Sequence, residues 1–331
     1  MEALEAARLV GLARRLLAAG AVEVPHEVAA DLVAAHHRVA IRDLTLERTL
    51  LQALDVWGVD PALVRVLKGP AIAHLDEADP ACRSFIDVDL LVPSDHLASV
   101  VAAALAHGAE RSFPELRPGF DRRFSKGVNL VLPSGFALDL HRSLAQGPFG
   151  LAIDPDELAA AWEPFTVGGT PLRALDRAGR WVHACQHAVL GGVVPPLVSL
   201  RDVVLTMPRT DAELADALGR AARWRCEAVL AEAVRLAARR LLLDPAAAPE
   251  WGPVATWVGS VRPTRRERRW LSAYRGARST PLLTLYGAEA VRGARARAAY
   301  ARAILHPLEV GADPSRLRRL RRAVGSLPRH R

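Results

Sequence analysis

Two aspartates in a short apolar segment are the first residues whose types and spacing indicate chemistry. Asp87 and Asp89 alternate with apolar residues between Ile86 and Leu91. Because successive side chains of a strand point to opposite faces, the spacing predicts that both carboxylates lie on one face of a strand. Carboxylates so close repel each other and are costly to bury unless a cation balances them. Their oxygen atoms are ligands that suit magnesium.

A third carboxylate occurs later in the chain. Asp139 lies in a second predicted strand, residues 137–141, again between apolar neighbours. Three carboxylates from two strands are able to hold two metal ions about 3.5–4 Å apart, the arrangement used for in-line displacement at phosphorus. His141 is two residues further on the same strand face, where a structural role and a substrate-orienting role are equally well supported. The Asp-x-Asp pair alone is also common at exposed strand edges, so the prediction depends on the residues around it.

Basic residues near these carboxylates support the same chemistry. Lys68 and Gly69 end a predicted strand, and Arg83 lies four residues before Asp87. Glycine permits close approach of the backbone to a phosphate, while the two cations are suited to neutralising a triphosphate. Only two of the 44 basic residues are lysines, so in a sequence that favours arginine we expect Lys68 to be needed as a lysine. The other, Lys126, is explained equally well as an exposed loop cation.

The elements that must position these residues form an α+β fold: a small mixed or antiparallel sheet with flanking helices and a large helical C-terminal domain. We expect an N-terminal helical segment over residues 1–60, an α/β core over 61–150, and a helical domain with an arginine-rich tail over 151–331. Alternation and turn residues predict the strands and a helix after Ser94, and from about residue 156 the apolar spacing is helical throughout. The strand-like segments are VRVL, DVDLLV, VNLVLP and FALDL.

Composition limits the class of protein. The chain has 331 residues, of which 50% are hydrophobic and 24% charged, which is typical of a globular protein with a sizeable core. No apolar run reaches the about 18 residues of a membrane-spanning helix. The N-terminal residues mix charges into their apolar positions, unlike a secretory signal. The three cysteines, Cys82, Cys185 and Cys226, are scattered singly, so we expect a cytoplasmic protein with no membrane partner.

Charge is distributed unevenly along the chain. Residues 261–331 contain 18 arginines against four acidic residues, a balance of +14, although the whole chain carries only +8. A basic tail of this kind is suited to a polyanion such as RNA. Solvated faces of amphipathic helices explain the same arginines equally well.

Taken together, these motifs resemble the uncharacterised nucleotidyltransferase family of bacteria within the DNA polymerase β-like superfamily. The resemblance covers about residues 1–240 and is specific in the middle third of the chain. It rests on three segments and on later residues similar to the family's spaced histidines and short aspartate motif. These are VLKGPAIA (66–73), RSFIDVDLLVP (83–93), LDLH (138–141), His183, His187 and Arg201-Asp202.

The resemblance implies an activity and a cofactor. It implies Mg2+-dependent transfer of a nucleoside monophosphate from a nucleoside triphosphate, such as ATP, to an unknown acceptor by a two-metal mechanism. Asp87 and Asp89 would ligate two Mg2+ ions, and Asp139 would complete the metal site and help deprotonate the acceptor. Since family members are often encoded beside peptide natural-product genes, the implied acceptor is a small molecule or a peptide.

The resemblance also implies phosphate-binding roles for Lys68, Gly69 and Arg83. Here the sequence departs from the wider superfamily, which usually has Gly-Gly or Gly-Ser shortly before the first aspartate. Pro70 follows Gly69 instead, and the serine that would hold a phosphate is missing.

Two other functions remain open from the sequence. One is a catalytically silent nucleotide- or partner-binding module, and the other is RNA modification through the basic tail. His183 and His187 have the spacing of a zinc pair on a helix, but without an apparent third ligand helix packing is favoured. A structural role is likewise favoured for Asp202.

Overall fold

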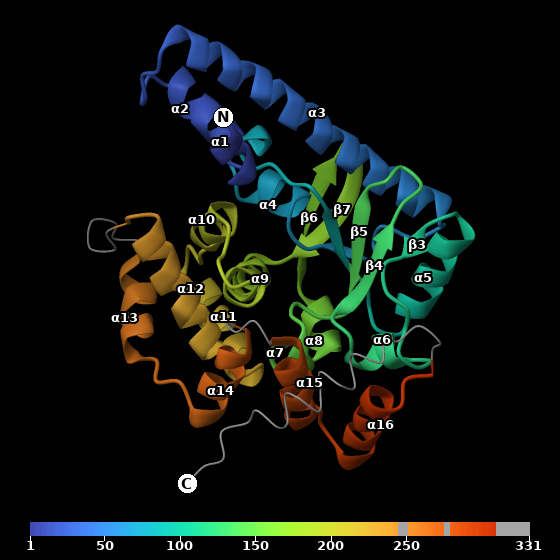
Figure 1. The fold of residues 1–331 in the computed structure, drawn as a ribbon. Coiled ribbons are helices and arrows are strands. Elements are labelled where there is room, and N and C mark those ends of the chain that lie inside the picture. The colour runs from blue at the N-terminus through green and yellow to red at the C-terminus, as the bar shows by residue number, and fades with distance from the viewer. Residues whose placement is uncertain (244–250, 275–278, 309–331) are drawn as a thin grey trace.

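The structure is a computed structural model that describes residues 1–243, 251–274 and 279–308. The end of the predicted arginine-rich tail, residues 309–331, lies outside this range. A mixed sheet of seven strands, formed by the described residues, is flanked by helices (Figure 1). The strands are β1 (Arg65–Val66), β2 (Val88–Leu91), β3 (Glu110–Arg111), β4 (Gly127–Val131), β5 (Ala137–His141), β6 (Trp162–Val167) and β7 (Thr170–Leu175).

The strand order is β3-β4-β5-β2-β1-β7-β6. Strands β2 and β5 are adjacent and parallel, with Asp89 opposite Asp139 in the register. Strand β1 is antiparallel to β2 and parallel to β7, while β4 and β5 form the predicted antiparallel hairpin. The two strands that carry the candidate aspartates are therefore direct neighbours.

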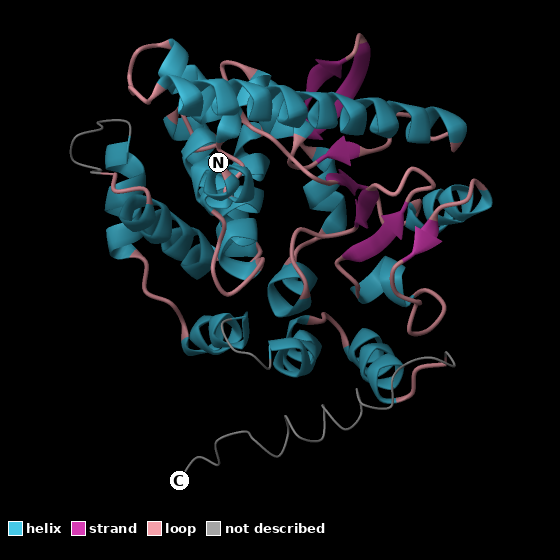
Figure 2. Cartoon of the chain, turned by 45° about the horizontal axis from the view of Figure 1, so that its top comes forward, coloured by secondary structure: helices cyan, strands magenta, loops and turns pink. Residues whose placement is uncertain are grey.

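Nine helical segments precede β6 in the described chain, and the longest of them is α3. Helix α3 spans 31 residues and runs as one continuous helix across the molecule (Figure 2). The N-terminal helices are α1 (Glu2–Ala6), α2 (Val10–Ala18) and α3 (His26–Val56), followed by α4 (Pro70–Leu75), the 3-10 helix η1 (Pro80–Cys82), α5 (Leu97–Ala106), α6 (Phe120–Phe124), α7 (Gly147–Ala152) and α8 (Pro155–Ala160).

Helices make up the rest of the described chain after β7. They are α9 (Arg177–Leu190), α10 (Leu197–Leu205), α11 (Asp211–Arg223), α12 (Glu227–Arg240), α13 (Gly252–Ser260), α14 (Arg265–Tyr274), α15 (Ser279–Ala290) and α16 (Ala294–Leu305). None of the described helices is long and apolar enough to cross a membrane.

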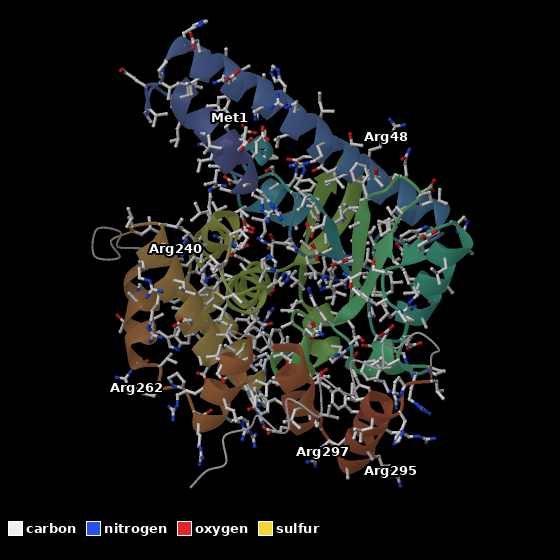
Figure 3. All side chains as sticks on the ribbon, in the orientation of Figure 1. Met1, Arg48, Arg240, Arg262, Arg295 and Arg297 are labelled. Carbon is white, nitrogen blue, oxygen red and sulfur yellow. The ribbon has the colours of Figure 1, made fainter. Side chains whose placement is uncertain are left out.

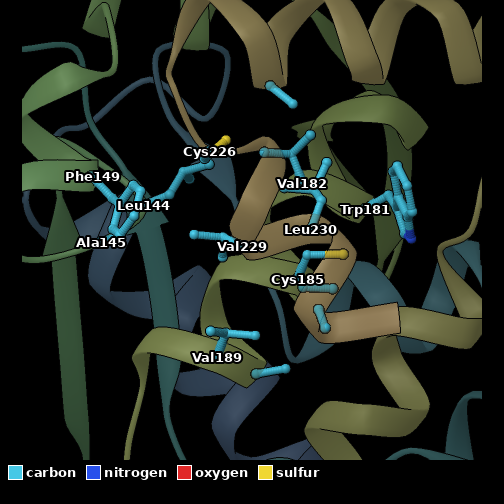
Figure 4. Packing of buried hydrophobic residues seen from close by; sticks show 14 of the residues in the cluster. Leu144, Ala145, Phe149, Trp181, Val182, Cys185, Val189, Cys226, Val229 and Leu230 are labelled. Carbon is cyan, nitrogen blue, oxygen red and sulfur yellow. The ribbon is translucent and has the colours of Figure 1, made fainter. Parts of the chain in front are cut away.

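Strand β2 is buried on both faces. Val88 and Leu90 enter an apolar cluster with residues of α3 and α5. Leu91 enters a second cluster, which is built largely from α9 and α12 (Figure 4). Figure 1 shows the corresponding layers, with the sheet between α3 and the α9–α12 helices. Burial on both faces explains why the strand reads as nearly continuous apolar sequence, interrupted only by its aspartate.

Strands β6 and β7 correct one expectation from the sequence. Helical spacing was expected from about residue 156, but residues 162–175 form an antiparallel hairpin whose second strand pairs with β1 at Val66 and Ala174. The hairpin turns at Gly168 and Gly169, both with positive φ (54° and 83°), as a two-residue turn of this hand requires. The sheet therefore extends beyond residue 150, while the division of the chain into three parts stays a prediction.

Candidate active site

The register between β2 and β5 brings two of the predicted aspartates together. Carboxylate oxygens of Asp89 and Asp139 and a ring nitrogen of His141 all lie within 4.8 Å of one another. Asp89 is 1% exposed, whereas Asp139 is half-buried and accepts a hydrogen bond from Asn129 Nδ2 at 2.5 Å. Side chains at directly paired positions of adjacent strands lie on the same face, so the pairing places these groups in one site.

Asp87 joins this site through Lys68. The lysine follows β1, and its Nζ lies 3.0 Å from Oδ2 of Asp89 and 3.4 Å from Oδ2 of Asp87. Asp87 immediately precedes β2 and its side chain is 28% exposed, so it lies at the solvent-facing side of the pair. Burial alone would lower the pKa of Lys68, but the two carboxylates outweigh it and raise that pKa.

Asp89 is held as an anion despite its burial. Burial favours its neutral form, but the Lys68 charge and a 2.7 Å hydrogen bond with Nε2 of His141 outweigh that effect and hold its pKa well below the usual range. The other oxygen, Oδ2, is fully buried and pairs with the Lys68 ammonium 3.0 Å away. Two carboxylates and an imidazole within 4.8 Å of one another offer oxygen and nitrogen ligands to a metal ion, so the side chains present fit the implied cation.

Lys126 also reaches the site. It immediately precedes β4, and its carbonyl accepts hydrogen bonds from the backbone N–H groups of Arg142 and Ser143 at 2.7 and 3.0 Å. Gly127 permits this approach, because a Cβ there would lie 2.1 Å from the Leu140 carbonyl oxygen. Burial lowers the pKa of Lys126, and the negative charge of Asp89 opposes that shift. Both lysines of the chain therefore act on the same carboxylates, Lys68 through close ion pairs and Lys126 through its charge from farther away.

Two histidines of α9 extend the site on its other side. The ring centroids of His141 and His183 are 6.5 Å apart, and those of His183 and His187 are 6.3 Å apart. Burial holds the pKa of both α9 histidines well below the usual range, so both rings are neutral at pH 7. Sequence reasoning favoured packing for this pair; its four-residue spacing was the signal that the two rings share one helix face.

Arg83 lies next to the site but is engaged elsewhere. Its Nε and Nη2 donate to the two carboxylate oxygens of Asp202 on α10, at 3.1 and 2.7 Å. Arg83 is 2% exposed, and its Nη1 has no hydrogen-bond partner. The nearby carboxylates of Asp87 and Asp89 also help to raise its pKa, behind the larger effect of Asp202. The pair links the segment before β2 to the helical layer, a contact that the sequence did not predict.

Gly69 adopts a backbone conformation that suits glycine. It has φ of +60° and ψ of −113°, outside the regions open to other residues. Pro70 follows at the first position of α4, so the chain turns sharply directly after Lys68. The turn fixes where the lysine side chain emerges from the end of β1.

The mixed sheet thus brings the Asp-x-Asp segment at the start of β2 beside Asp139 on the neighbouring strand β5. The chain belongs to the family described as uncharacterised nucleotidyltransferase, which matches residues 1–241. A solved nucleotidyltransferase-like antigenic protein from Paracoccidioides brasiliensis is similar over 58% of this chain and 93% of its own, at 16% identity and a TM-score of 0.32. No curated protein matches the sequence.

Proposed function

We propose that the protein transfers a nucleoside monophosphate from a nucleoside triphosphate to a small-molecule or peptide acceptor, with two Mg2+ ions bound at the aspartates. The observation that carries the proposal is the pairing of Asp89 with Asp139 across parallel strands, which brings carboxylate oxygens of both residues within 4.8 Å of each other. Divalent cations at such a site neutralise the charge that develops on the phosphoryl oxygens.

The chain's own residues have distinct roles in this proposal. Asp87 and Asp89 hold the cations that accompany the triphosphate, and Asp139 completes the site on the acceptor's side. Asp139 is half-buried and hydrogen-bonded only through Asn129 among the described residues, so it is free to accept the proton of the attacking hydroxyl. The hydroxyl oxygen forms a bond to the α-phosphorus as the bond to pyrophosphate breaks.

Basic residues would bind the phosphates. Lys68 is already within ion-pair distance of both aspartates that face the donor, and Gly69 turns the chain directly after this lysine. Arg83 contributes the Nη1 group that Asp202 does not occupy. These side chains would balance the negative charge of the triphosphate and of the leaving pyrophosphate.

We place the reaction in the cytoplasm. The three cysteines are free and buried, which agrees with a reducing compartment.

The test is nucleotide transfer by the full chain. We expect pyrophosphate release, or self-labelling from an α-labelled nucleoside triphosphate, in the presence of Mg2+. Asp89→Asn removes a metal-binding charge and should lower the rate at least 1000-fold. Asp95→Asn is the matched control, because Asp95 is four residues after the end of β2 and its side chain is 89% exposed.

Two results would contradict the proposal. One is release of pyrophosphate that Asp89→Asn leaves unchanged. The other is binding of Mg2+ and nucleotide with no transfer of any of the four common nucleoside monophosphates, which would favour a silent binding module.

A further inference from the structure

Arg8 has two unusual features. It lies in the turn between α1 and α2, with φ of +56°, a left-handed conformation that is costly for any residue with a side chain. Its guanidinium group makes no hydrogen bond or close ion pair with the residues that the structure describes, although the carboxylates of Asp87 and Asp202 attract it from farther away. A strained, half-buried arginine without a hydrogen bond contributes little to the stability of this turn.

Packing holds Arg8 close to the candidate site. Helix α2 lies directly against η1, because a Cβ at Gly11 would be only 1.9 Å from the Ala81 carbonyl oxygen. Cys82 Sγ lies 3.9 Å from the Gly11 carbonyl oxygen. The start of α2 is therefore fixed against the segment that leads into Arg83.

Helix α3 brings another arginine to the same segment. Arg42 donates to the Asp43 carboxylate at 3.1 Å, and the same carboxylate accepts the backbone N–H of Phe85 at 3.3 Å. Phe85 is two residues before Asp87. Arg8, Arg42 and Arg83 thus come from three separate segments to the residues before β2, where Asp43, Asp87 and Asp202 partly balance their charge.

Arg8 lies within electrostatic range of these groups. Burial lowers the pKa of Arg8, the carboxylates of Asp87 and Asp202 oppose this shift, and the positive charges of Arg83 and Arg42 add to it. Arginines that repel one another destabilise the free protein, and an anion bound between them relieves the repulsion. Their planar guanidinium groups match phosphate oxygens in pairs.

We propose that Arg8, with the unpartnered Nη1 of Arg83 and the neighbouring Arg42, binds the terminal phosphates of the nucleoside triphosphate. The inference rests on the proposed function and deepens it. Residues from the N-terminal helices provide hydrogen-bond donors for the terminal phosphates of the nucleoside triphosphate, in a chain that has Pro70 rather than a serine after Gly69. The three arginines lie on the Asp87 side of the aspartates, so the terminal phosphates would point toward α2 and α3.

Binding of inorganic tripolyphosphate with Mg2+ to the full chain, measured by calorimetry, tests this role. The main variant is Arg8→Gly, because glycine adopts positive φ without strain while it removes the arginine side chain with its guanidinium group. We expect at least tenfold weaker tripolyphosphate binding by this variant, with a melting temperature of the free protein equal to or above that of the parent. A residue needed only for the fold would show the opposite: a lower melting temperature and unchanged affinity.

Two controls make the result specific. Arg48→Ala removes an exposed arginine of α3, labelled in Figure 3, and should leave tripolyphosphate binding unchanged. Binding of AMP should be nearly equal in the parent and Arg8→Gly, since AMP lacks the terminal phosphates. Tripolyphosphate affinity that is unchanged in Arg8→Gly overturns the inference.

The outcomes also separate this inference from the proposed function. If the parent transfers nucleotides and Arg8→Gly keeps the same KM for the nucleoside triphosphate, the function stands and the role of Arg8 is wrong. If the parent shows no transfer but binds tripolyphosphate in an Arg8-dependent way, the role of Arg8 stands and the proposed function fails.

Discussion

Lys68 Nζ lies 3.0 Å from Oδ2 of Asp89. An ammonium group therefore already pairs with the carboxylate that is best placed to bind a metal ion. The lysine balances a buried anion that would otherwise raise the free energy of the folded protein. It also competes with any cation that approaches Asp89. The free protein is therefore stabilised by a charge that must move when metal and nucleotide bind.

Lys68→Met should consequently separate metal binding from nucleotide binding. Without the competing ammonium, we expect several-fold tighter binding of Mn2+ in the absence of nucleotide, measured by electron paramagnetic resonance. Binding of the nucleoside triphosphate should weaken, and the metal-free melting temperature should fall because Asp89 loses its counterion. Weaker Mn2+ binding in Lys68→Met would show that the lysine does not compete for the site.

His141 predicts the selectivity of the site among divalent cations. Its ring nitrogen lies within 4.8 Å of the Asp89 and Asp139 oxygens, and imidazole favours transition metals over Mg2+. We expect the parent to bind Co2+ more tightly than Mg2+ in calorimetry. His141→Gln should weaken Co2+ binding by about 10-fold to 100-fold and Mg2+ binding much less. Equal losses for the two cations would instead make His141 a positioning residue for Asp89.

The Arg83–Asp202 pair predicts a large effect on stability. Both side chains are buried and joined by two hydrogen bonds. Asp202→Ala leaves the Arg83 charge buried without its carboxylate, which should lower the free energy of unfolding by about 3–5 kcal/mol in urea titrations. The double variant Arg83→Met, Asp202→Leu removes both charges and should lose much less. A double variant as unstable as Asp202→Ala would contradict this account.

Asp43 predicts a specific pH dependence of stability. Burial raises its pKa from 3.8 to about 6, so the folded protein holds this proton more tightly than the unfolded chain. Between about pH 4 and pH 6 the unfolded chain ionises first, and the Asp43 contribution to the free energy of unfolding falls by about 3 kcal/mol. Asp43→Asn lacks this loss. Its stability relative to the parent should therefore rise from pH 4 to pH 6 and then level off.

Urea titrations across this pH range measure that difference directly. Asp55→Asn, at an exposed position of the same helix, is the control and should follow the parent at every pH. A difference between Asp43→Asn and the parent that is independent of pH would contradict the assigned ionisation.

Local sequence patterns predicted the strands that carry the aspartates, because successive side chains of a strand point to opposite faces. Alternation places Val88 and Leu90 in the core, and the structure confirms both positions together with the proximity of Asp89 and Asp139. The predicted α+β fold class, a mixed sheet with flanking helices, is also confirmed. Which strands become neighbours is set by packing of the whole chain, so the parallel pairing itself had no local signal.

Other features depend on contacts between distant segments. The partnership of Arg83 with Asp202 spans 119 positions, and nothing in either segment specifies the other. The sequence did not decide whether Lys126 is an exposed loop cation or a functional residue. The scarcity of lysine applied to Lys126 as much as to Lys68. The Gly168-Gly169 turn was a local hairpin signal, but the helical composition around it outweighed that signal in the sequence analysis.

The position of β7 has a practical consequence for shorter forms of the protein. Strand β1 lies between β2 and β7, and β7 supplies its partner at Val66. A chain cut after residue 150 would lose the β6–β7 hairpin and expose the backbone N–H and C=O groups along one side of β1. Open strand edges of this kind pair with other chains. Such a fragment should self-associate and aggregate even though it retains all three aspartates.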